Sequence, residues 1–239
     1  MHTIDDEVMR AKMRKLRVST FADIFYEIVS DEAYADALPE DIFLAAVDEA
    51  YAQRQQRNIA KAISQAKFRY PNASLAEITR AEERGINLRQ LKRIAATNWR
   101  ENPTNIHILA PTGTGKTYIA CALGVAACQA GYSVAYYRLD QLVDMSAVFS
   151  PTDETYLTMM RKLINIDVLI IDDFMTMSIN QRGQEDLAKI IFDREGPTAN
   201  SDFVAVSGCL LGCRASGQGW GGFVGQPTQQ RLPNPDRRL

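Results

Sequence analysis

The chain has 239 residues, of which 46% are apolar and 23% are charged, the composition of an ordinary soluble globular protein that can bury a sizeable core. Its formal net charge of -2 gives no overall attraction to nucleic acid, so such binding would require a local basic surface. The N-terminus lacks an apolar signal segment, and no stretch reaches the roughly 18 consecutive apolar residues of a membrane span. We therefore expect a cytoplasmic protein without a membrane partner.

The first part of the chain, residues 1–100, shows helical patterns throughout. Residues 9–16 alternate apolar and basic side chains, and the helical patterns that follow cover residues 21–28, 42–67, 74–84 and 88–96. Pro71 and the polar residues that follow it interrupt this pattern. We expect an all-helical N-terminal region that binds DNA or a partner.

The pattern changes near Asn105, where short apolar runs begin to alternate with helical segments. The runs typical of strands are 106–110, 131–137 and 168–173, and the segments typical of helices are 118–130, a polar stretch after 137, and 184–193. Alternating strands and helices indicate a parallel sheet with helices on both faces. Residues 101–196 are therefore expected to form an α/β core.

Beyond Gly196 the composition changes again. Glycines crowd together, and a tail rich in Gln, Pro and Arg follows. Only residues 203–206, Phe-Val-Ala-Val, are typical of a strand. We expect residues 197–239 to form an irregular tail.

A glycine-rich loop follows the first strand, with the sequence Ala-Pro-Thr-Gly-Thr-Gly-Lys-Thr over residues 110–117. It matches the Walker A pattern of P-loop NTPases except that Ala110 replaces the first glycine. Gly113 and Gly115 allow the backbone to turn its amides toward phosphate oxygens, and the helix that follows adds its positive end. A glycine-rich turn that merely precedes a helix is the alternative. The acidic strand downstream favours the nucleotide loop.

The side chains of this loop have separate expected roles. Lys116 should reach the β- and γ-phosphates as a catalytic residue, and the Thr117 hydroxyl should ligate Mg²⁺. The predicted ATP-binding residues are Pro111, Thr112, Gly113, Thr114, Gly115, Lys116, Thr117 and Tyr118.

The strand at 168–173 reads Val-Leu-Ile-Ile-Asp-Asp, a Walker B pattern. Its two carboxylates emerge at the C-terminal edge of the sheet, where open α/β sheets bind ligands. Asp172 is expected to hold Mg²⁺, and Asp173 to polarise the attacking water as a catalytic residue. An apolar run ending in two aspartates is weak by itself. The phosphate loop upstream makes the assignment specific.

Basic residues without an intervening acid lie between Tyr51 and Tyr70. They are Arg54, Arg57, Lys61, Lys67 and Arg69. The first three are spaced three and four residues apart, so they share one helix face that could neutralise phosphates of duplex DNA. A solvated surface is the alternative, and the absence of a base-reading motif argues against sequence-specific recognition.

These motifs together resemble the IstB family, the ATP-dependent helper proteins encoded beside the transposase of certain bacterial insertion sequences, which are related to DnaC-like helicase loaders. The segments that carry the resemblance are 13–17, 66–71, 111–117, 131–138, 169–174 and 191–196. It implies an AAA+ P-loop NTPase fold, with an all-α N-terminal extension and an irregular C-terminal tail here. It also implies ATP and Mg²⁺, non-specific DNA binding under ATP control, ATP-dependent homo-oligomers, and assistance to a transposase.

The tail departs from this resemblance. Family members continue after Gly196 with a strand ending in a polar sensor and a helical region carrying an arginine near the γ-phosphate, and neither is visible. We interpret this as a one-nucleotide shift of the reading frame. When the residues after Gly196 are back-translated and the codons are read one base further on, permissible codons encode a sequence that resembles the family. The gene's DNA sequence tests this interpretation directly. Loss of the sensor and the arginine removes stabilisation of the charge in the transition state, which is worth about 10³ or more in rate. We therefore expect the chain to bind ATP weakly and to hydrolyse little of it.

Two other functions are compatible with the same residues. The first is a helicase loader that grips a replicative helicase through its N-terminal helices. The second is a non-functional remnant of a decayed transposition protein, which would be insoluble or would fail to bind nucleotide.

Overall fold

The computed structural model describes residues 6–79, 81, 85–101, 105–110, 113–174, 179–194 and 202–208. The chain divides into two compact units, which are residues Met1–Lys61 and Ala62–Leu239. The second unit thus contains residues 62–100 together with the α/β core. Within the described residues, no helix combines the length and the apolar character needed to cross a membrane.

The first unit is helical. Its elements are α1 (Asp6–Lys15), α2 (Ser19–Val29), the 3₁₀ helix η1 (Glu32–Tyr34) and most of α3 (Pro39–Ala66). Helix α3 begins with a proline, which suits a first helical position, and carries Glu40 and Asp41 in its first turn, where the helix dipole favours acids. Phe21 of α2 contacts Phe43 of α3 edge to face, with ring centroids 5.5 Å apart. Helix α3 is therefore the element on which α2 packs.

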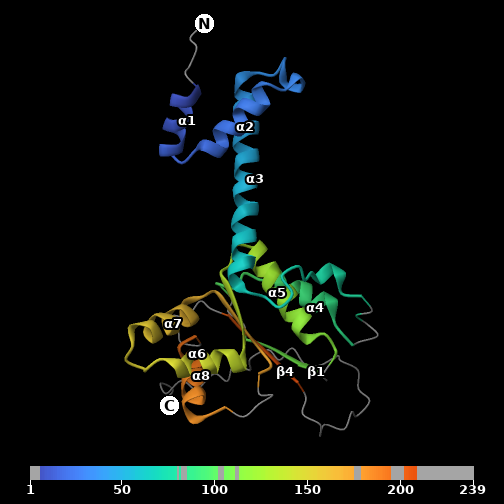
Figure 1. The fold of residues 1–239 in the computed structure, drawn as a ribbon. Coiled ribbons are helices and arrows are strands. Elements are labelled where there is room, and N and C mark those ends of the chain that lie inside the picture. The colour runs from blue at the N-terminus through green and yellow to red at the C-terminus, as the bar shows by residue number, and fades with distance from the viewer. Residues whose placement is uncertain are drawn as a thin grey trace, which may run out of the picture. The chain divides into compact units, whose positions relative to one another are not determined.

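The second unit alternates strands and helices after a short helical start (Figure 1). In chain order its elements are η2 (Leu75–Glu77), α4 (Leu88–Ala95), β1 (Ile106–Ala110), α5 (Lys116–Gln129), β2 (Val134–Arg138), α6 (Leu139–Val148), α7 (Glu154–Asn165), β3 (Val168–Asp172), α8 (Gln181–Arg194) and β4 (Asp202–Gly208).

The four strands form one sheet in the order β1-β4-β3-β2, and every neighbouring pair is parallel. This confirms the predicted parallel α/β architecture. Strand β4 pairs with β1 on one side and with β3 on the other, so it separates the two strands that lead to the Walker motifs. The run at 203–206 is thus part of a central strand.

Helices cover both faces of the sheet. Alternate side chains of β3 pack into two different hydrophobic clusters, one on each face. Val168 and Ile170 belong to the cluster that contains α5, whereas Leu169 and Ile171 pack with α6, α7 and α8. All four side chains are fully buried. The unbroken apolar run of β3 is what a strand covered on both faces requires.

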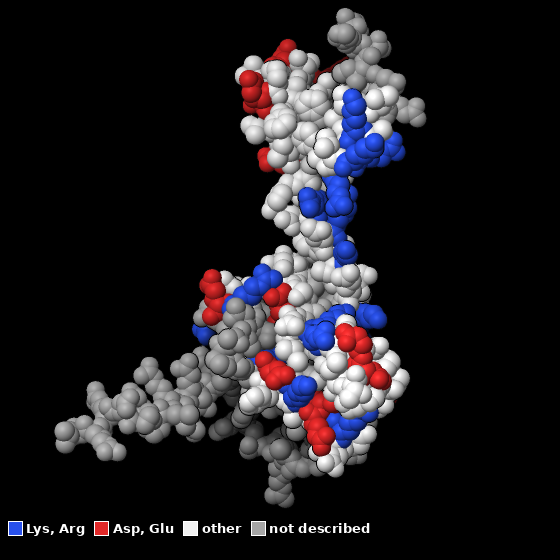
Figure 2. Space-filling view, turned by 90° about the vertical axis from the view of Figure 1, so that its left-hand side faces the viewer, with Lys and Arg blue, Asp and Glu red and all other residues white. Residues whose placement is uncertain are grey.

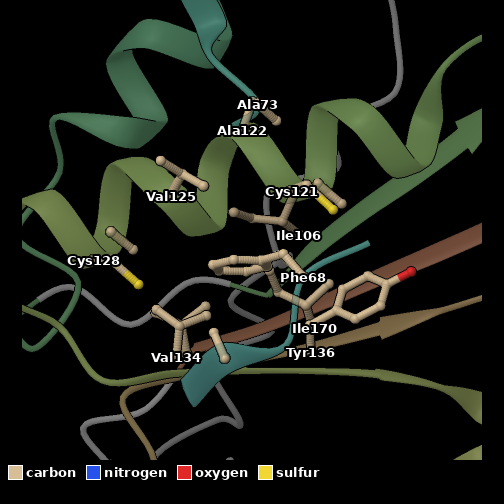
Figure 3. Close-up of a cluster of buried hydrophobic side chains, with 14 of the residues drawn as sticks. Phe68, Ala73, Ile106, Cys121, Ala122, Val125, Cys128, Val134, Tyr136 and Ile170 are labelled. Carbon is tan, nitrogen blue, oxygen red and sulfur yellow. The ribbon is translucent and has the colours of Figure 1, made fainter. Parts of the chain in front are cut away.

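Phe68 fixes the position of α5 on the sheet (Figure 3). A Cβ atom added to Gly124 of α5 would lie 2.5 Å from the Phe68 ring and 2.7 Å from the Ile170 side chain. The absence of a side chain at this position therefore lets α5, Phe68 and the sheet approach closely. The segment that follows α3 is in this way anchored in the core.

Two elements differ from the sequence-based expectation. The helix expected over 74–84 is only the 3₁₀ turn η2, because Ile78 is extended (φ -70°, ψ 97°) and is buried in a cluster with Ile119; residues 80 and 82–84 lie outside the described part. Strand β2 begins at Val134 rather than at 131. The preceding residues close α5, with Gly131 at φ +85° and hydrogen bonds back to the last helical turn.

Asp167 joins three segments at the amino edge of the sheet. Its carboxylate accepts hydrogen bonds from Nε and Nη2 of Arg100, both 2.8 Å long, and from the backbone N and Oγ of Ser133, both 2.7 Å long. Burial raises the pKa of Asp167, but the hydrogen bonds from Arg100 and Ser133 outweigh it and lower the pKa from 3.8 to about 2.

This lowered pKa predicts an acid-sensitive contribution to stability. We expect Asp167 to contribute about 1–2 kcal/mol, after allowance for the solvent-exposed Arg100, at any pH above its unfolded pKa. The contribution is lost as the pH falls below about 4 toward 2. Urea unfolding of the unaltered chain and of Asp167→Asn across this range measures it. The stability difference between them should vanish in acid, and a pH-independent difference would contradict the prediction.

Candidate nucleotide-binding site

The loop between β1 and α5 has the backbone of a phosphate-binding loop. Gly113 and Gly115 both adopt φ of +84°, in the left-handed region that strains other residues. Gly115 directly precedes the first residue of α5, so the loop ends at the positive end of a 14-residue helix. The predicted residues Pro111 and Thr112 lie outside the described part of the chain.

Thr117 and Asp172 meet although 55 residues separate them in the chain. The Thr117 hydroxyl donates a 3.2 Å hydrogen bond to Oδ1 of Asp172, which is only 1% exposed. The backbone N of Asp173 donates to the same oxygen at 2.9 Å. The two side chains predicted as Mg²⁺ ligands therefore lie side by side at the C-terminal edge of the sheet, next to the start of α5.

Tyr136 of β2 also belongs to this cluster, and the sequence analysis did not select it. Its hydroxyl donates a 2.5 Å hydrogen bond to Oδ2 of Asp172. Burial raises the pKa of Tyr136, and the hydrogen bond to Asp172 raises it further, so the hydroxyl keeps its proton. The signal in the sequence that could have indicated it is its place near the end of β2, the strand that pairs with the Walker B strand β3.

The donor set suits a hard cation. A hydroxyl oxygen from Thr117 and a carboxylate from Asp172 are the oxygen ligands that Mg²⁺ accepts, usually while it keeps several waters and binds substrate phosphates. The Tyr136 hydrogen bond orients the carboxylate from behind, as outer hydrogen bonds do at metal sites. The residues present therefore fit Mg²⁺ bound together with a nucleotide.

Asp173 differs from Asp172 in its exposure and its neighbours. Its backbone is left-handed (φ +55°), and its side chain is 44% exposed. Oδ2 of Asp173 lies 3.3 Å from Nε of Arg138, whose Nη2 lies 2.9 Å from Oδ2 of Asp140. Arg138 is a second residue at this edge that the sequence analysis missed.

Tyr118 joins the start of α5 to the segment before α4. Its hydroxyl donates to Oε2 of Glu77 at 3.0 Å and accepts from the backbone N of Ser74 at 3.2 Å. Its ring lies 5.8 Å from that of Tyr70. A Tyr in this place therefore ties the phosphate-loop helix to the chain that follows α3.

A hollow of about 410 Å³ opens in the same unit. It is lined by Ala81, Ile86, Asn87, Leu88 and Arg89. Ala81 and Ile86 share a hydrophobic cluster with Ile119, against which Tyr118 and Leu88 pack. Two of the lining residues thus belong to the cluster that also contains Ile119 of α5, and Asn87 and Arg89 add polar groups to the lining.

The five predicted DNA-contacting residues divide between the two units. Arg54, Arg57 and Lys61 are exposed on α3, and Arg57 donates hydrogen bonds to Oγ1 of Thr20 at 3.4 Å and to the carbonyl of Gln53 at 3.3 Å. Lys67 and Arg69 follow the end of α3, where Lys67 is left-handed (φ +58°) and Arg69 lies over the Tyr70 ring at 5.7 Å. Only the first three share a helix face.

Comparisons with known proteins identify the family of the chain. Residues 11–202 match the family model described as IstB-like ATP binding protein. The chain belongs to this family. It is 32% identical over 150 residues to an ATP-binding protein of insertion sequence IS1162 from Pseudomonas fluorescens, a match that covers 63% of this chain and 64% of that protein. It is 25% identical over 217 residues to the insertion sequence ATP-binding protein y4pL of Sinorhizobium fredii, covering 91% and 84%.

Solved structures show the same fold at low sequence identity. DnaA from Aquifex aeolicus bound to AMPPCP has a TM-score of 0.51 and 22% identity, over 58% of this chain and 43% of that one. The DnaC helicase loader has a TM-score of 0.50 and 18% identity, over 61% and 82%. The IstB-like chain is thus an AAA+ P-loop NTPase in fold.

Proposed function

We propose that this IstB-like protein is an ATP-binding helper of DNA transposition, which binds Mg²⁺–ATP at the phosphate loop, binds DNA non-specifically, and assists a transposase. The contact of Thr117 with the buried Asp172 beside Gly113 and Gly115 carries the nucleotide part of the proposal. The insertion-sequence names of its relatives support the transposition part.

The residues of the loop would act on the triphosphate in distinct ways. The amides around Gly113, Thr114 and Gly115 would donate to phosphate oxygens, and Lys116 would neutralise the β- and γ-phosphates. When bound, Mg²⁺ would polarise the γ-phosphoryl group. Thr117 and Asp172 would hold that ion, and Asp173 would accept a proton from the attacking water. Hydrolysis would be slow without a γ-phosphate sensor.

The base and ribose would lie beside the N-terminal part of α5. The hollow of about 410 Å³, whose apolar lining residues Ala81 and Ile86 share a hydrophobic cluster with Ile119, would receive these groups. Binding pockets for small ligands commonly combine such an apolar lining with a few polar side chains. Asn87 and Arg89 would supply them here.

Nucleotide binding by the purified chain tests this function. Titration with a fluorescent ATP analogue and Mg²⁺ should give saturable binding, and Lys116→Ala should weaken it about 10- to 100-fold, because charge-assisted hydrogen bonds to phosphate are lost. Circular dichroism of both proteins controls for folding. A folded, soluble chain that does not bind would contradict the proposal and favour a decayed remnant.

The first unit supplies the DNA surface in this proposal. Lys and Arg gather on one side of the unit and Asp and Glu on another (Figure 2). Besides the exposed basic residues of α3, the first unit carries exposed basic residues in α1 and just after its end, which are Arg10, Lys12, Arg14, Lys15 and Arg17. All residues from 31 to 49 that carry charge are acidic. This separation lets a chain of net negative charge bind a polyanion locally.

Neutralising the α3 face should therefore weaken DNA binding. The triple change Arg54→Gln, Arg57→Gln and Lys61→Gln is expected to lower affinity for duplex DNA about tenfold or more at low salt, with equal effects on unrelated sequences. The slope of log affinity against log salt should decrease by about 2–3. Fluorescence anisotropy measures both. The same change at the exposed Arg161, Lys162 and Lys189 is the matched control, and equal losses in the two triple variants would exclude a specific surface.

A helicase loader is the second candidate, supported by the fold shared with DnaC. Co-purification from cells that contain both a transposase and a replicative hexameric helicase distinguishes the two functions. Capture of the transposase with DNA supports the transposition helper, and capture of the helicase supports the loader. In either function we propose that ATP promotes association of copies, which size-exclusion chromatography with and without ATP measures.

A further inference from the structure

Helix α4 of the second unit carries basic side chains on one face and apolar side chains on the other. Arg89, Lys92 and Arg93 are exposed, and their spacing of three and four residues places them on one side of the helix. Leu91 and Ile94 turn the opposite way, into the cluster that contains Ile119 and Leu123 of α5. No acidic residue occurs from residue 84 to residue 100. We call the three basic side chains the α4 basic face.

Helix α4 is held in place at both of its ends. Before its first residue, Oδ1 of Asn87 accepts a 3.0 Å hydrogen bond from the backbone N of Gln90. Near its end, Nε1 of Trp99 donates a 2.6 Å hydrogen bond to the carbonyl of Ile94. Because the backbone that carries the α4 basic face is already ordered, a ligand bound there would pay little for ordering it.

The α4 basic face has no acidic partner, whereas several other arginines of the second unit have one. Arg100 pairs with Asp167 at 2.8 Å, and Arg182 lies 3.9 Å from Asp186. The side chains of the α4 basic face make no ion pair or hydrogen bond with any residue that the structure describes. Their positive charge is therefore available to an external anion.

Helix stability alone does not account for these charges. Lys92 and Arg93 lie in the last turn of α4, where the helix dipole favours cations. Arg89, however, is the second residue of the helix, at the positive end of the dipole, and the first turn contains no acid. A cation in that position is unfavourable for the isolated helix, so the dipole explains only part of the α4 basic face.

We propose that the α4 basic face binds the phosphate backbone of duplex DNA, so that the unit that contains the nucleotide site contacts DNA itself. The inference rests on the DNA binding proposed above and adds a second surface to that of the first unit. Residues three and four apart on a helix have Cβ atoms about 5–6 Å apart, so their long side chains can reach successive phosphates. Such contacts carry no sequence information.

DNA suits this face better than a protein partner does. Protein interfaces usually have an apolar centre surrounded by polar groups. The large apolar side chains that are exposed in the described part of the chain include none from α4. A surface of cations without an exposed apolar centre is what interfaces with nucleic acid require, because phosphate contacts supply most of their affinity.

The test changes Lys92→Gln and Arg93→Gln together in the full chain and leaves Arg89 in place, because Arg89 also lines the hollow proposed for the base and ribose. Affinity for a duplex of mixed sequence should fall about tenfold at low salt, and the slope of log affinity against log salt should decrease by about 2. Affinity for the fluorescent ATP analogue should stay unchanged. Exchanging the two cations, with Lys92→Arg and Arg93→Lys, should preserve DNA binding.

A matched pair on α7 provides the control. Arg161→Gln with Lys162→Gln removes the same charge from exposed neighbours and should leave DNA affinity nearly unchanged. Acetylation of lysines followed by mass spectrometry then locates the contact. Added duplex should protect Lys92 from acetylation and should not protect Lys162.

Both the loss of affinity and the protection of Lys92 are required, and either one without the other contradicts the inference. If the change at 92 and 93 has no effect while the triple change on α3 weakens binding, the inference is wrong and the proposed function stands. If the unaltered chain does not bind duplex DNA, the DNA part of the proposed function fails and the inference fails with it. Unchanged DNA affinity with loss of transposase capture would identify a protein-binding surface instead.

Discussion

Replacing Arg194 with methionine is expected to lower the free energy of unfolding by about 3–5 kcal/mol. Arg194 ends α8 and is only 3% exposed. Its Nη1 atom donates hydrogen bonds to the carbonyl oxygens of Leu163 at 2.7 Å, Ile164 at 3.1 Å and Ile166 at 2.8 Å, and Nη2 donates to that of Asp167 at 3.2 Å. One guanidinium thus closes the end of α7 and the turn into β3.

The size of this effect follows from what methionine leaves behind. The last carbonyls of a helix have no partner within the helix, and a positive charge there also stabilises the helix dipole. Methionine fills a similar volume but donates nothing, so these carbonyl groups remain buried without the hydrogen bonds that Arg194 supplies. The loss should affect the whole second unit, because α7, α8 and β3 share one core.

Urea unfolding followed by circular dichroism measures this prediction. Arg161→Met is the matched control, because Arg161 lies on α7 itself and is 64% exposed. We expect the control to change stability by less than about 0.5 kcal/mol. Equal destabilisation by the two changes would show that the carbonyl contacts of Arg194 do not matter for stability.

The change Asp172→Asn is expected to remove most of the Mg²⁺-dependent part of ATP affinity, a loss of about 100-fold. The Asp172 carboxylate is 1% exposed and accepts hydrogen bonds from Thr117, Tyr136 and the backbone of Asp173. Asparagine keeps the shape and accepts through one oxygen, but it carries no charge for the cation. The fold should therefore survive while the metal contact is lost.

Titration of the fluorescent ATP analogue with saturating Mg²⁺ and with EDTA separates the two contributions to affinity. The unaltered chain should bind ATP more weakly in EDTA than in Mg²⁺, and Asp172→Asn should show only a small difference between the two conditions. Tyr136→Phe is an informative companion, because it removes only the hydrogen bond that orients the carboxylate and should weaken the Mg²⁺ effect by about 10-fold. A full Mg²⁺ effect in Asp172→Asn would exclude Asp172 as the metal ligand.

Local sequence was sufficient for the parts of the molecule that consecutive residues build. Glycines at 113 and 115 followed by a helix predict the phosphate loop, and both adopt the left-handed backbone that glycine favours. The unbroken apolar run of β3 predicts a strand buried on both faces, and the alternation of strands and helices predicts the parallel sheet. Each of these signals lies in consecutive residues or in the order of segments along the chain.

Long-range packing decided the rest. In the described residues of the segment 74–84, only the 3₁₀ turn η2 forms, and Ile78 is extended and buried in one cluster with Ile119 instead of continuing a helix. The insertion of β4 between β1 and β3 depends on pairing with strands far away in the chain. No period in the sequence specifies which strands become neighbours.

The same division applies to the site. Consecutive residues predict the loop with Lys116 and Thr117, and a second short run predicts Asp172 at the end of β3 and Asp173 directly after it. Contacts between elements place the Tyr136 hydroxyl on Asp172 and Arg138 beside Asp173, and away from the site they place Arg194 on the carbonyls that end α7. The physical reason is that a side chain on one element meets its partner on another only after parallel pairing and helix packing have fixed the register between them.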